Sequence, residues 1–495
     1  MVQAGDHAPI AFAVVTLSHL DTKTVRRMAT DTSGRTAFTS VDLGRYRLRV
    51  TASGFLNWGD SGVDAFTSTA FELTAASVHR SLSVRLVPMS SISGSVLTTD
   101  GAPVPDVVVH AIEVGASVSD GPPMPSSRAV TDDLGRFAIA ELKPGSYIVG
   151  VGARELGDTM TGRIGVPASF YPGAVLVEDA EKIPLDPGEH RLAVTVQTHL
   201  TTFHTVQGQI VGGQPIGGAA VWIAPSSDLI SDEAIYSTTA GPDGAFKFPA
   251  VAAGSYLIKV WSRSPAASAS QEISVDAEST AQPIVISAVP HDAISGTVGA
   301  APLTGAARRS LRVMIDPVGV GLARWSAMRQ NASADVTGKF QLSGLLPGRY
   351  RVSVIGIDAA VQSVTIDGRA YRGHEVDVDE LVSTMDISLT TDVGRILGTS
   401  AGNDGVTHVA LFPEASALWS LADRGSSLFR LALVGPEGEF RFSQVLPGEY
   451  IVAGLDPSAL SGWRRPAVLG TLAAGGVRVI VNGRKDYPVQ LRRGR

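Results

Sequence analysis

Residues 130–151 read VTDDLGRFAIAELKPGSYIVGV, and this stretch decides the fold of the whole chain. It contains a turn at Gly135, an alternating apolar run that begins with Phe137, a second turn at Gly145, and another alternating run that begins with Tyr147. Alternation of apolar and polar residues is typical of a half-buried β-strand. The stretch therefore predicts two short strands joined by a tight turn.

The same spacing of glycines and aromatic residues recurs at intervals of about 100 residues. The copies are Gly34, Gly44 and Tyr46; Gly135, Phe137, Gly145 and Tyr147; Gly244, Phe246, Gly254 and Tyr256; Gly338, Phe340, Gly348 and Tyr350; and Gly438, Phe440, Gly448 and Tyr450. Repetition at this period predicts five tandem domains, each large enough to bury its own core.

Each position of the repeat has a physical role. The first glycine follows turn-forming residues, as in DDLG, GPDG and GPEG, and it supplies a positive φ that a side chain resists. The tyrosine is expected to be a core or corner residue whose hydroxyl bonds a nearby backbone group, as is common in β-sandwiches. We therefore interpret the repeated residues as structural.

Composition agrees with an all-β protein and excludes several classes of function. Only 18% of the 495 residues are charged, while 53 are glycine and 28 are proline. The net charge of −6 is spread thinly, which argues against a nucleic-acid partner. The chain has no cysteine, so disulfides, thiol catalysis and Cys-based zinc sites are excluded. It contains neither an apolar run long enough to span a membrane nor a signal peptide.

The turn spacing predicts Ig-like or prealbumin-like β-sandwiches at residues 1–89, 90–199, 200–290, 291–391 and 392–495. Short linkers favour an elongated, semi-rigid array. Aligning Ala8-Pro9 with Ala102-Pro103 places the counterpart of Gly94 just before Met1. The chain is therefore expected to begin inside the first strand of a repeat, so that the first domain lacks its opening strand. We expect Met1 to be a miscalled start or a fragment boundary, with a signal peptide upstream.

At these residues the chain resembles the carboxypeptidase regulatory-like domain, which has a transthyretin-like or prealbumin-like sandwich within the carbohydrate-binding-like folds. The matching segments are ISGSV at Gly94, GAPVPDVVV at Gly101, TDDLGRF and LKPGSY, with later copies such as LLPGRY and VLPGEY. The second, fourth and fifth domains look most like tandem arrays in secreted proteins of soil bacteria. The resemblance implies a fold and an accessory role rather than a ligand.

No pattern in the chain predicts an enzyme or a cofactor. Only His110 precedes a glutamate by three residues, as a zinc carboxypeptidase would need, but His110 and Glu113 lie in a strand-like run where residues three apart point to opposite faces, and no HExxH occurs. The GDSG segment at 59–62 imitates a serine-protease nucleophile but has no accompanying base, so we interpret it as an ordinary turn. Asp377, Asp379 and Glu380 lack calcium-loop spacing, and His199 and His204 are too few for a zinc site.

A covalent cross-link of the kind found in isopeptide-forming pilin domains is also not expected. It would need a lysine near an opening strand and an asparagine in a closing strand, and the expected strands have neither. Exposed aromatic residues remain as candidate ligand contacts, because tryptophan and tyrosine faces stack on sugar rings. These candidates are Trp419, Trp463, Trp58, Trp325 and Tyr171, whereas Trp222 and Trp261 lie in strand-like runs and are expected to be core residues.

We therefore expect a non-enzymatic modular protein that is secreted, periplasmic or exposed on the outer surface of a bacterium. Its expected role is structural display, adhesion or carbohydrate binding, with a polysaccharide or a cell-surface protein as partner. The alternative is an accessory region of a larger cell-surface receptor, transporter or peptidase system, which neighbouring coding sequence would reveal.

Overall fold

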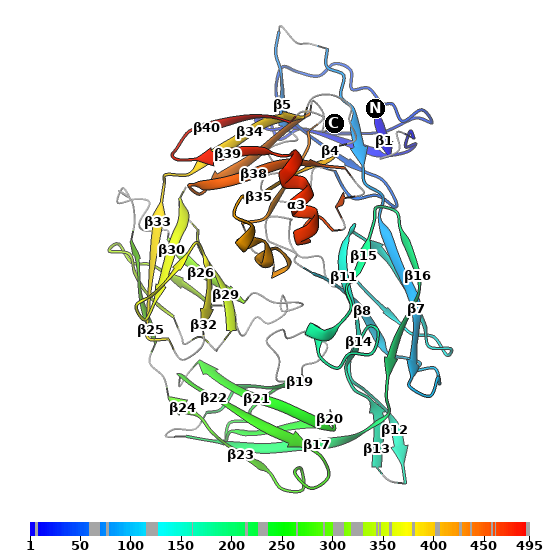
Figure 1. Cartoon of the computed structure of the whole chain (residues 1–495), viewed down its shortest axis with the longest axis vertical. Helices are drawn as coiled ribbons and strands as arrows, with labels where there is room; N and C mark the ends of the chain where they lie inside the picture. The colour runs from blue at the N-terminus through cyan, green and yellow to red at the C-terminus, as the bar shows by residue number, and fades with distance from the viewer. Residues whose placement is uncertain are drawn as a thin grey trace.

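The computed structural model describes residues 1–4, 8–58, 70–75, 79–114, 127–160, 162–212, 216–225, 236–263, 266–290, 293–299, 311–317, 330–342, 345, 348–355, 359–378, 382–400, 406–424, 428–435, 438–456, 459–460 and 462–491. These residues form β-sandwiches that follow one another along the chain (Figure 1). The prediction of tandem all-β sandwiches is confirmed, while the residue boundaries between them stay predictions.

The strands of the first sandwich are β1 (Val2–Ala4), β2 (Val14–His19), β3 (Val25–Ala29), β4 (Gly44–Thr51), β5 (Ala70–Leu73) and β6 (Val84–Leu86). Those of the second are β7 (Ser90–Thr98), β8 (Val108–Glu113), β9 (Ser127–Val130), β10 (Arg136–Leu142), β11 (Gly145–Val151), β12 (Arg154–Thr159), β13 (Gly162–Val166), β14 (Ser169–Phe170), β15 (Ile183–Leu185) and β16 (His190–Thr198), with the 3-10 helix η2 (Val177–Asp179).

The third sandwich has β17 (Thr201–Val211), β18 (Ala220–Ala224), β19 (Tyr236–Thr239), β20 (Ala245–Ala252), β21 (Gly254–Arg263), β22 (Ala266–Val275), β23 (Ile284–Ser287) and β24 (Val289–Pro290). The fourth has β25 (Ile294–Gly299), β26 (Arg312–Pro317), β27 (Gln330–Ser333), β28 (Lys339–Leu342), β29 (Gly348–Ile355), β30 (Ala360–Ile366), β31 (Arg369–Arg372), β32 (Glu375–Val378) and β33 (Thr384–Thr390). The fifth has β34 (Gly394–Ser400), β35 (His408–Pro413), η5 (Ser416–Arg424), β36 (Arg430–Leu433), β37 (Glu439–Val445), β38 (Gly448–Leu455), α3 (Pro466–Gly475), β39 (Val477–Val481) and β40 (Asp486–Leu491).

All of the sandwiches share one strand pairing. The opening strand runs parallel to the closing strand of the same sandwich: β1 with β6, β7 with β16, β17 with β23, β25 with β33, and β34 with β40. In the facing sheet, the strand that begins near the second glycine pairs antiparallel with an earlier strand, as β11 does with β8. Each sandwich thereby buries a cluster of Val, Ile, Leu and aromatic side chains between its two sheets.

The first glycine of the repeat occupies the turn conformation that the sequence predicts. Its φ is +69° at Gly34 and +70° at Gly135, and it is also positive at Gly244, Gly338 and Gly438. A Cβ on Gly135 would lie 2.6 Å from the carbonyl oxygen of Val96 in the opening strand. Glycine is therefore required here for two reasons, because the backbone is left-handed and because the turn lies directly against β7.

The tyrosines form the predicted corners. The hydroxyl of Tyr46 donates to the carbonyl of Asp42 at 2.8 Å, that of Tyr147 to Lys143 at 2.9 Å, and that of Tyr256 to Ala252 at 3.0 Å. Tyr350 and Tyr450 are buried in the fourth and fifth cores, with 1% and 7% of their surface exposed. The corner fixes the start of the strand that follows the second turn, because it ties the buried ring to the backbone four residues upstream.

The opening strand of the first sandwich is present in short form. β1 pairs with β6 through Val2, Gln3 and Ala4, and the Val2 amide donates to the carbonyl of Gly34 as the Val96 amide does to that of Gly135. The expectation that the strand is missing is therefore corrected, because the residues that meet the glycine turn are in place.

A hairpin from the second sandwich extends the sheet of the third. β12 and β13 pair with each other, and β13 then pairs antiparallel with β17 through Arg163, Ile164 and Gly165. The resulting sheet has the order β12-β13-β17-β20, with β23 also on β17. The second and third sandwiches are thus joined by backbone hydrogen bonds as well as by the chain itself.

The expected elongated array is not observed, because the chain curves until its first and fifth sandwiches touch (Figure 1). Leu433 of β36 belongs to the hydrophobic cluster of the first sandwich and is 8% exposed. In the other direction, Val87 and Leu56 pack into a cluster on the outer face of the fifth sandwich, beneath α3 and η5. Burial of apolar surface at both points favours the closed arrangement over a rod.

Candidate functional site

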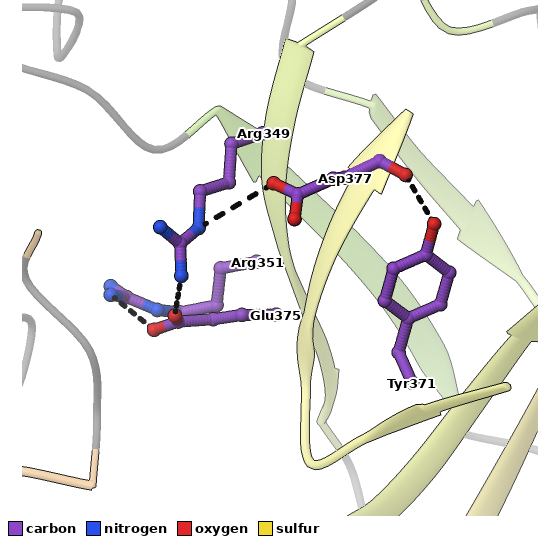
Figure 2. Close-up of polar contacts among 5 residues, drawn as sticks. All are labelled: Arg349, Arg351, Tyr371, Glu375 and Asp377. Atoms are coloured by element: carbon purple, nitrogen blue, oxygen red, sulfur yellow. Dashed lines mark hydrogen bonds and ion pairs between the residues drawn. The ribbon is translucent and has the colours of Figure 1, made fainter. Parts of the chain in front are cut away.

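A cluster of charged side chains lies on the outer face of the sheet formed by β27, β26, β29 and β32 in the fourth sandwich. Arg349 and Arg351 are two residues apart on β29, and Glu375 and Asp377 are two residues apart on β32, so each pair shares one face. The register places Arg349 opposite Asp377 and Arg351 opposite Glu375. Figure 2 shows the four side chains extending to the same side of the sheet.

Glu375 is held between the two arginines. Its Oε2 lies 3.0 Å from Nη2 of Arg349, and its Oε1 lies 3.5 Å from Nη2 of Arg351. The side chains of Arg349, Arg351 and Glu375 are only 19%, 13% and 12% exposed, whereas Asp377 is 58% exposed and lies 3.8 Å from Arg349. The Tyr371 hydroxyl donates to the Asp377 carbonyl at 2.6 Å (Figure 2). The cluster is therefore a largely covered ion-pair network.

His374 extends this network toward the fifth sandwich. Burial is the main cause that lowers the pKa of His374 to about 4; the positive charges of Arg351 and Arg430 contribute to this shift and the charge of Glu375 opposes it. Arg430 belongs to β36 of the fifth sandwich, where its Nη1 donates to the carbonyl of Ser443 at 2.8 Å. The imidazole is consequently neutral at pH 7, and the network lies where the fourth and fifth sandwiches approach each other.

The chemistry of this network is electrostatic. A carboxylate shared by two guanidinium groups fixes the relative positions of β29 and β32, and a buried network of this kind contributes more to a defined geometry than to net stability. Across the described ranges, no group of three or more histidine, aspartate or glutamate side chains is arranged to hold a metal ion. We therefore assign the network a structural role within the fourth sandwich.

Two of the tryptophans predicted as exposed ligand contacts are buried, and the prediction of exposure is wrong for them. Trp58 is 5% exposed in the first core, where its backbone exchanges hydrogen bonds with Val50. Trp463 is 3% exposed in the cluster beneath α3, and the Arg464 guanidinium lies 4.7 Å from the centre of its ring. Both connections fold back over a sheet, because a tryptophan ring carries a large apolar area whose burial is favourable.

The other aromatic residues predicted as ligand contacts differ in their exposure and in their contacts. Trp419 is half-buried in η5, its indole N–H donates to the Pro413 carbonyl at 2.9 Å, and its ring meets Phe412 edge-on. Tyr171 packs against the core of the second sandwich and is partly exposed. Trp325 lies outside the described residues. Ligand contact at Trp419 and Tyr171 stays a prediction.

The strand tryptophans Trp222 and Trp261 are buried, as expected, with 3% and 6% of their surface exposed. They form a separate small cluster with Ala220 rather than joining the main core of the third sandwich. Ala220 and Trp261 lie opposite each other on β18 and β21, and Trp222 lies opposite Lys259, so the cluster is on the sheet face away from the core. Strand position predicts burial for these residues but not the face on which they lie.

The residues considered as metal ligands or as a nucleophile either contact neighbouring side chains, are exposed, or lie outside the described residues. Asp377 pairs with Arg349, while Asp379, Glu380 and the GDSG segment are outside the described residues. The ring of His204 contacts the Thr202 hydroxyl at 3.0 Å, and His199 is exposed at the junction before β17. The interpretation of the GDSG segment as an ordinary turn stays a prediction.

Sequence reasoning missed the arginine–glutamate network. A signal was present in the alternation of GRYRV on one strand and HEVDV on the other, which places like charges on one face of each strand. The two segments are 26 residues apart at Arg349 and Glu375, so their pairing depends on the register of the sheet.

A large exposed aromatic residue was also missed, because Phe12, which is 75% exposed, lies in a short turn of the first sandwich.

Comparison with known proteins supports the family resemblance over part of the chain. The family model of the carboxypeptidase regulatory-like domain matches residues 1–76. No curated protein matches the sequence. The resemblance expected from the sequence is thus confirmed for the first sandwich, and the chain is a modular all-β protein.

Several solved structures are similar at low identity. A streptococcal ancillary pilin is 12% identical with a TM-score of 0.22, covering 59% of this chain and 98% of the pilin. The Bacillus anthracis TIE protein is 11% identical with a TM-score of 0.15, covering 81% of this chain and 73% of that one. The shaft pilin SpaA from Lactobacillus rhamnosus GG is 13% identical with a TM-score of 0.17, covering 41% and 98%. Among the helices of the described residues, none has the length and apolar character needed to cross a bilayer.

Proposed function

We propose that this chain is a non-enzymatic structural protein, exported by a bacterium, that displays loops and hairpin tips to a surface partner for adhesion. The observation that carries the proposal is the closed arrangement of the sandwiches, in which Leu433 packs into the first core and Val87 packs into the outer cluster of the fifth sandwich. A ring of sandwiches closed by these two contacts holds its protruding segments in fixed relative positions. Several segments can then contact the partner surface at the same time, which strengthens attachment.

The polar groups of the repeat support a structural role. The corner tyrosines bond backbone carbonyls, and the Arg349–Glu375–Arg351 network bonds within itself. The variable parts of the sandwiches are the connections, and one of them carries the β12–β13 hairpin with the fully exposed Met160 at its tip. Binding residues commonly lie on loops that a rigid scaffold positions. Export is supported by the resemblance of several domains to arrays in secreted proteins.

The adhesive role is tested with the purified full chain coupled to beads. We expect saturable attachment of these beads to bacterial envelope preparations or isolated surface polysaccharides, with beads that carry an unrelated β-sandwich as the control. Attachment no greater than the control across the panel would refute the adhesive role. A turnover that survives purification and disappears with a single point mutation would refute the non-enzymatic assignment.

Export is tested separately by fractionation of the native organism. We expect the protein in the culture medium, the periplasm or the outer-surface fraction. Recovery in the cytoplasmic fraction, beside a cytoplasmic marker, would refute export.

A further inference from the structure

The outer face of the sheet formed by β3, β2, β4 and β5 in the first sandwich is open to solvent. Thr16 of β2 lies opposite Arg27 of β3, and Ser18 lies opposite Val25. Residues opposite each other in an antiparallel pair share a face, so these four side chains lie together on the side away from the core. Arg27 is exposed, and Val14 and Val25 on the same side are 39% and 50% exposed. We call the surface formed by these five residues the open face.

The matching faces of the other sandwiches are covered. In the second sandwich, Ile112 and Ile148 are buried against Phe170 and the 3-10 helix η2. In the fifth, α3 and η5 cover the sheet. In the third and fourth, Trp222 and Arg351 lie on the matching faces and are only 3% and 13% exposed. The first sandwich therefore leaves exposed, with two valines, a kind of face that the others bury.

The net charge of −6 is distributed unevenly among the predicted domains. Residues 1–89 and 392–495, the first and fifth sandwiches, contain 21 Lys and Arg and 16 Asp and Glu, which gives a charge of +5. Residues 90–290, the second and third sandwiches, contain 10 Lys and Arg and 21 Asp and Glu, which gives −11. None of the outward positions of β2, β3 and β4 carries a carboxylate. The open face therefore belongs to a basic part of a molecule that also has an acidic part.

The basic and acidic parts are both continuous bodies. The first and fifth sandwiches touch through Leu433, and the second and third are joined through β13 and β17. In Figure 1 the first and fifth sandwiches lie at one end of the long axis and the third lies at the other. Two copies of such a molecule attract each other most strongly when the acidic part of one meets the basic part of the next, which is a head-to-tail contact.

We propose that the open face binds the acidic second sandwich of a second copy of this chain, so that copies associate head to tail. Val14 and Val25 supply apolar area at the centre of the contact, and Arg27 supplies positive charge toward the partner. The second sandwich carries the largest excess of acid, with 14 Asp and Glu against 7 Lys and Arg in residues 90–199. This self-association goes beyond the adhesive function and does not depend on it.

The test is sedimentation velocity of the full chain over a range of concentrations, at ionic strengths of about 0.01 M and about 0.15 M, where charges interact over about 30 Å and about 8 Å. We expect dimers and longer oligomers at the lower ionic strength and dissociation at the higher. Val25→Glu/Arg27→Glu is expected to raise the dissociation constant at least about tenfold. Lys339→Glu/Gln341→Glu makes the same change of charge at exposed positions of β28 and is expected to alter that constant by less than about twofold.

Mixing two variants separates a head-to-tail contact from a folding defect. The variant Asp133→Lys/Glu141→Lys/Asp179→Lys changes three exposed carboxylates and removes most of the negative charge of the second sandwich. This variant and Val25→Glu/Arg27→Glu are each expected to stay monomeric where the wild type associates. Their mixture is expected to form a one-to-one complex that grows no further, because one partner keeps the open face and the other keeps the acidic sandwich.

Three results would overturn the inference. They are a wild-type chain that stays monomeric at low ionic strength, a Val25→Glu/Arg27→Glu variant that associates as the wild type does, and a mixture of the two variants that stays monomeric although both keep the circular dichroism of the wild type. Binding of the wild type to vesicles of anionic phospholipid without self-association would overturn it as well.

Discussion

The corner tyrosine is the smallest unit that the chain repeats, and its hydroxyl has a measurable energetic role. Tyr147 is 3% exposed and donates to the Lys143 carbonyl, so Tyr147→Phe leaves a buried carbonyl without that donor. We expect a loss of about 1 kcal/mol in the stability of the second sandwich. Hydrogen exchange of the β8 and β11 amides measures this loss, since the chain has several domains and a global transition would mix them.

A matched control for this substitution exists in the fourth sandwich. The Tyr371 hydroxyl also donates to a backbone carbonyl, that of Asp377, but at an exposed site where water can replace it. Tyr371→Phe is therefore expected to change exchange in β31 and β32 by less than about 0.5 kcal/mol. Equal effects of the two substitutions would contradict the assignment of Tyr147 as a buried corner.

His374 makes the fourth sandwich sensitive to acid. Its pKa is lowered to about 4 from an ordinary value of 6.5, so between these pH values the unfolded chain binds a proton that the folded chain does not. The free energy of unfolding is expected to decrease as pH falls through this window, by about 1 kcal/mol for each pH unit. It is expected to be independent of His374 above the window.

The measurement compares wild type with His374→Gln by hydrogen exchange of the β29 and β32 amides between pH 4 and pH 7, corrected for the intrinsic exchange rate. The groups facing the imidazole are Arg351, Glu375 and Arg430, and the difference between the two proteins removes contributions from titrating groups that both proteins share. Identical pH slopes in the two proteins would show that His374 is not held neutral by burial.

Residue roles could be predicted from sequence where they depend on short spacing. Each corner tyrosine bonds a backbone carbonyl close by in sequence, and each turn glycine has a positive φ within its own turn, so the short local spacing was enough to place them. Trp463 was misplaced because its burial depends on α3, η5 and Val87 meeting over one sheet. Contacts of that kind come from distant parts of the chain and leave no periodic signal.

At the scale of elements, the β12–β13 hairpin decides how the second and third sandwiches are joined. Gly165 lies opposite Thr201 at the start of β17, and a Cβ there would lie 2.1 Å from the Arg154 carbonyl oxygen and 2.7 Å from the Phe203 ring. Gly165→Val is therefore expected to separate the hairpin from β17. The expected readout is faster amide exchange at residues 163–165 and 201–203, with exchange in β8 and β11 unchanged.

The control for the hairpin is Leu156→Val, because Leu156 is 39% exposed on the outer strand β12. It is expected to leave exchange at residues 163–165 unchanged. The insertion itself could be recognised from the sequence as a long connection, but its pairing with the next sandwich could not. A short strand of mixed polarity can join any unpaired sheet edge that the chain brings near it.

At the scale of the whole molecule, the closed arrangement could not be predicted, because short linkers suit a rod and a ring equally well. Closure depends on which faces remain apolar after each sandwich has formed. The fifth sandwich presents such a face beneath α3 and η5, and it is met by Val87, in the segment joining the first and second sandwiches, and by Leu56, in the connection after β4. Two separate apolar contacts therefore join the first and fifth sandwiches.

Leu433 offers a direct test of closure, because it is 8% exposed and lies in the hydrophobic cluster of the first sandwich while belonging to β36 of the fifth. Leu433→Asp places a charge in that contact, which costs several kcal/mol unless the contact opens. We expect opening, since the sandwiches keep their own cores, and small-angle scattering should record a larger radius of gyration with unchanged circular dichroism. Ile480→Asp, at a position 55% exposed on the same sandwich, should leave the radius unchanged. An unchanged radius for Leu433→Asp, with Leu433 amide exchange also unaltered, would show that contact between the first and fifth sandwiches does not hold the frame closed in solution.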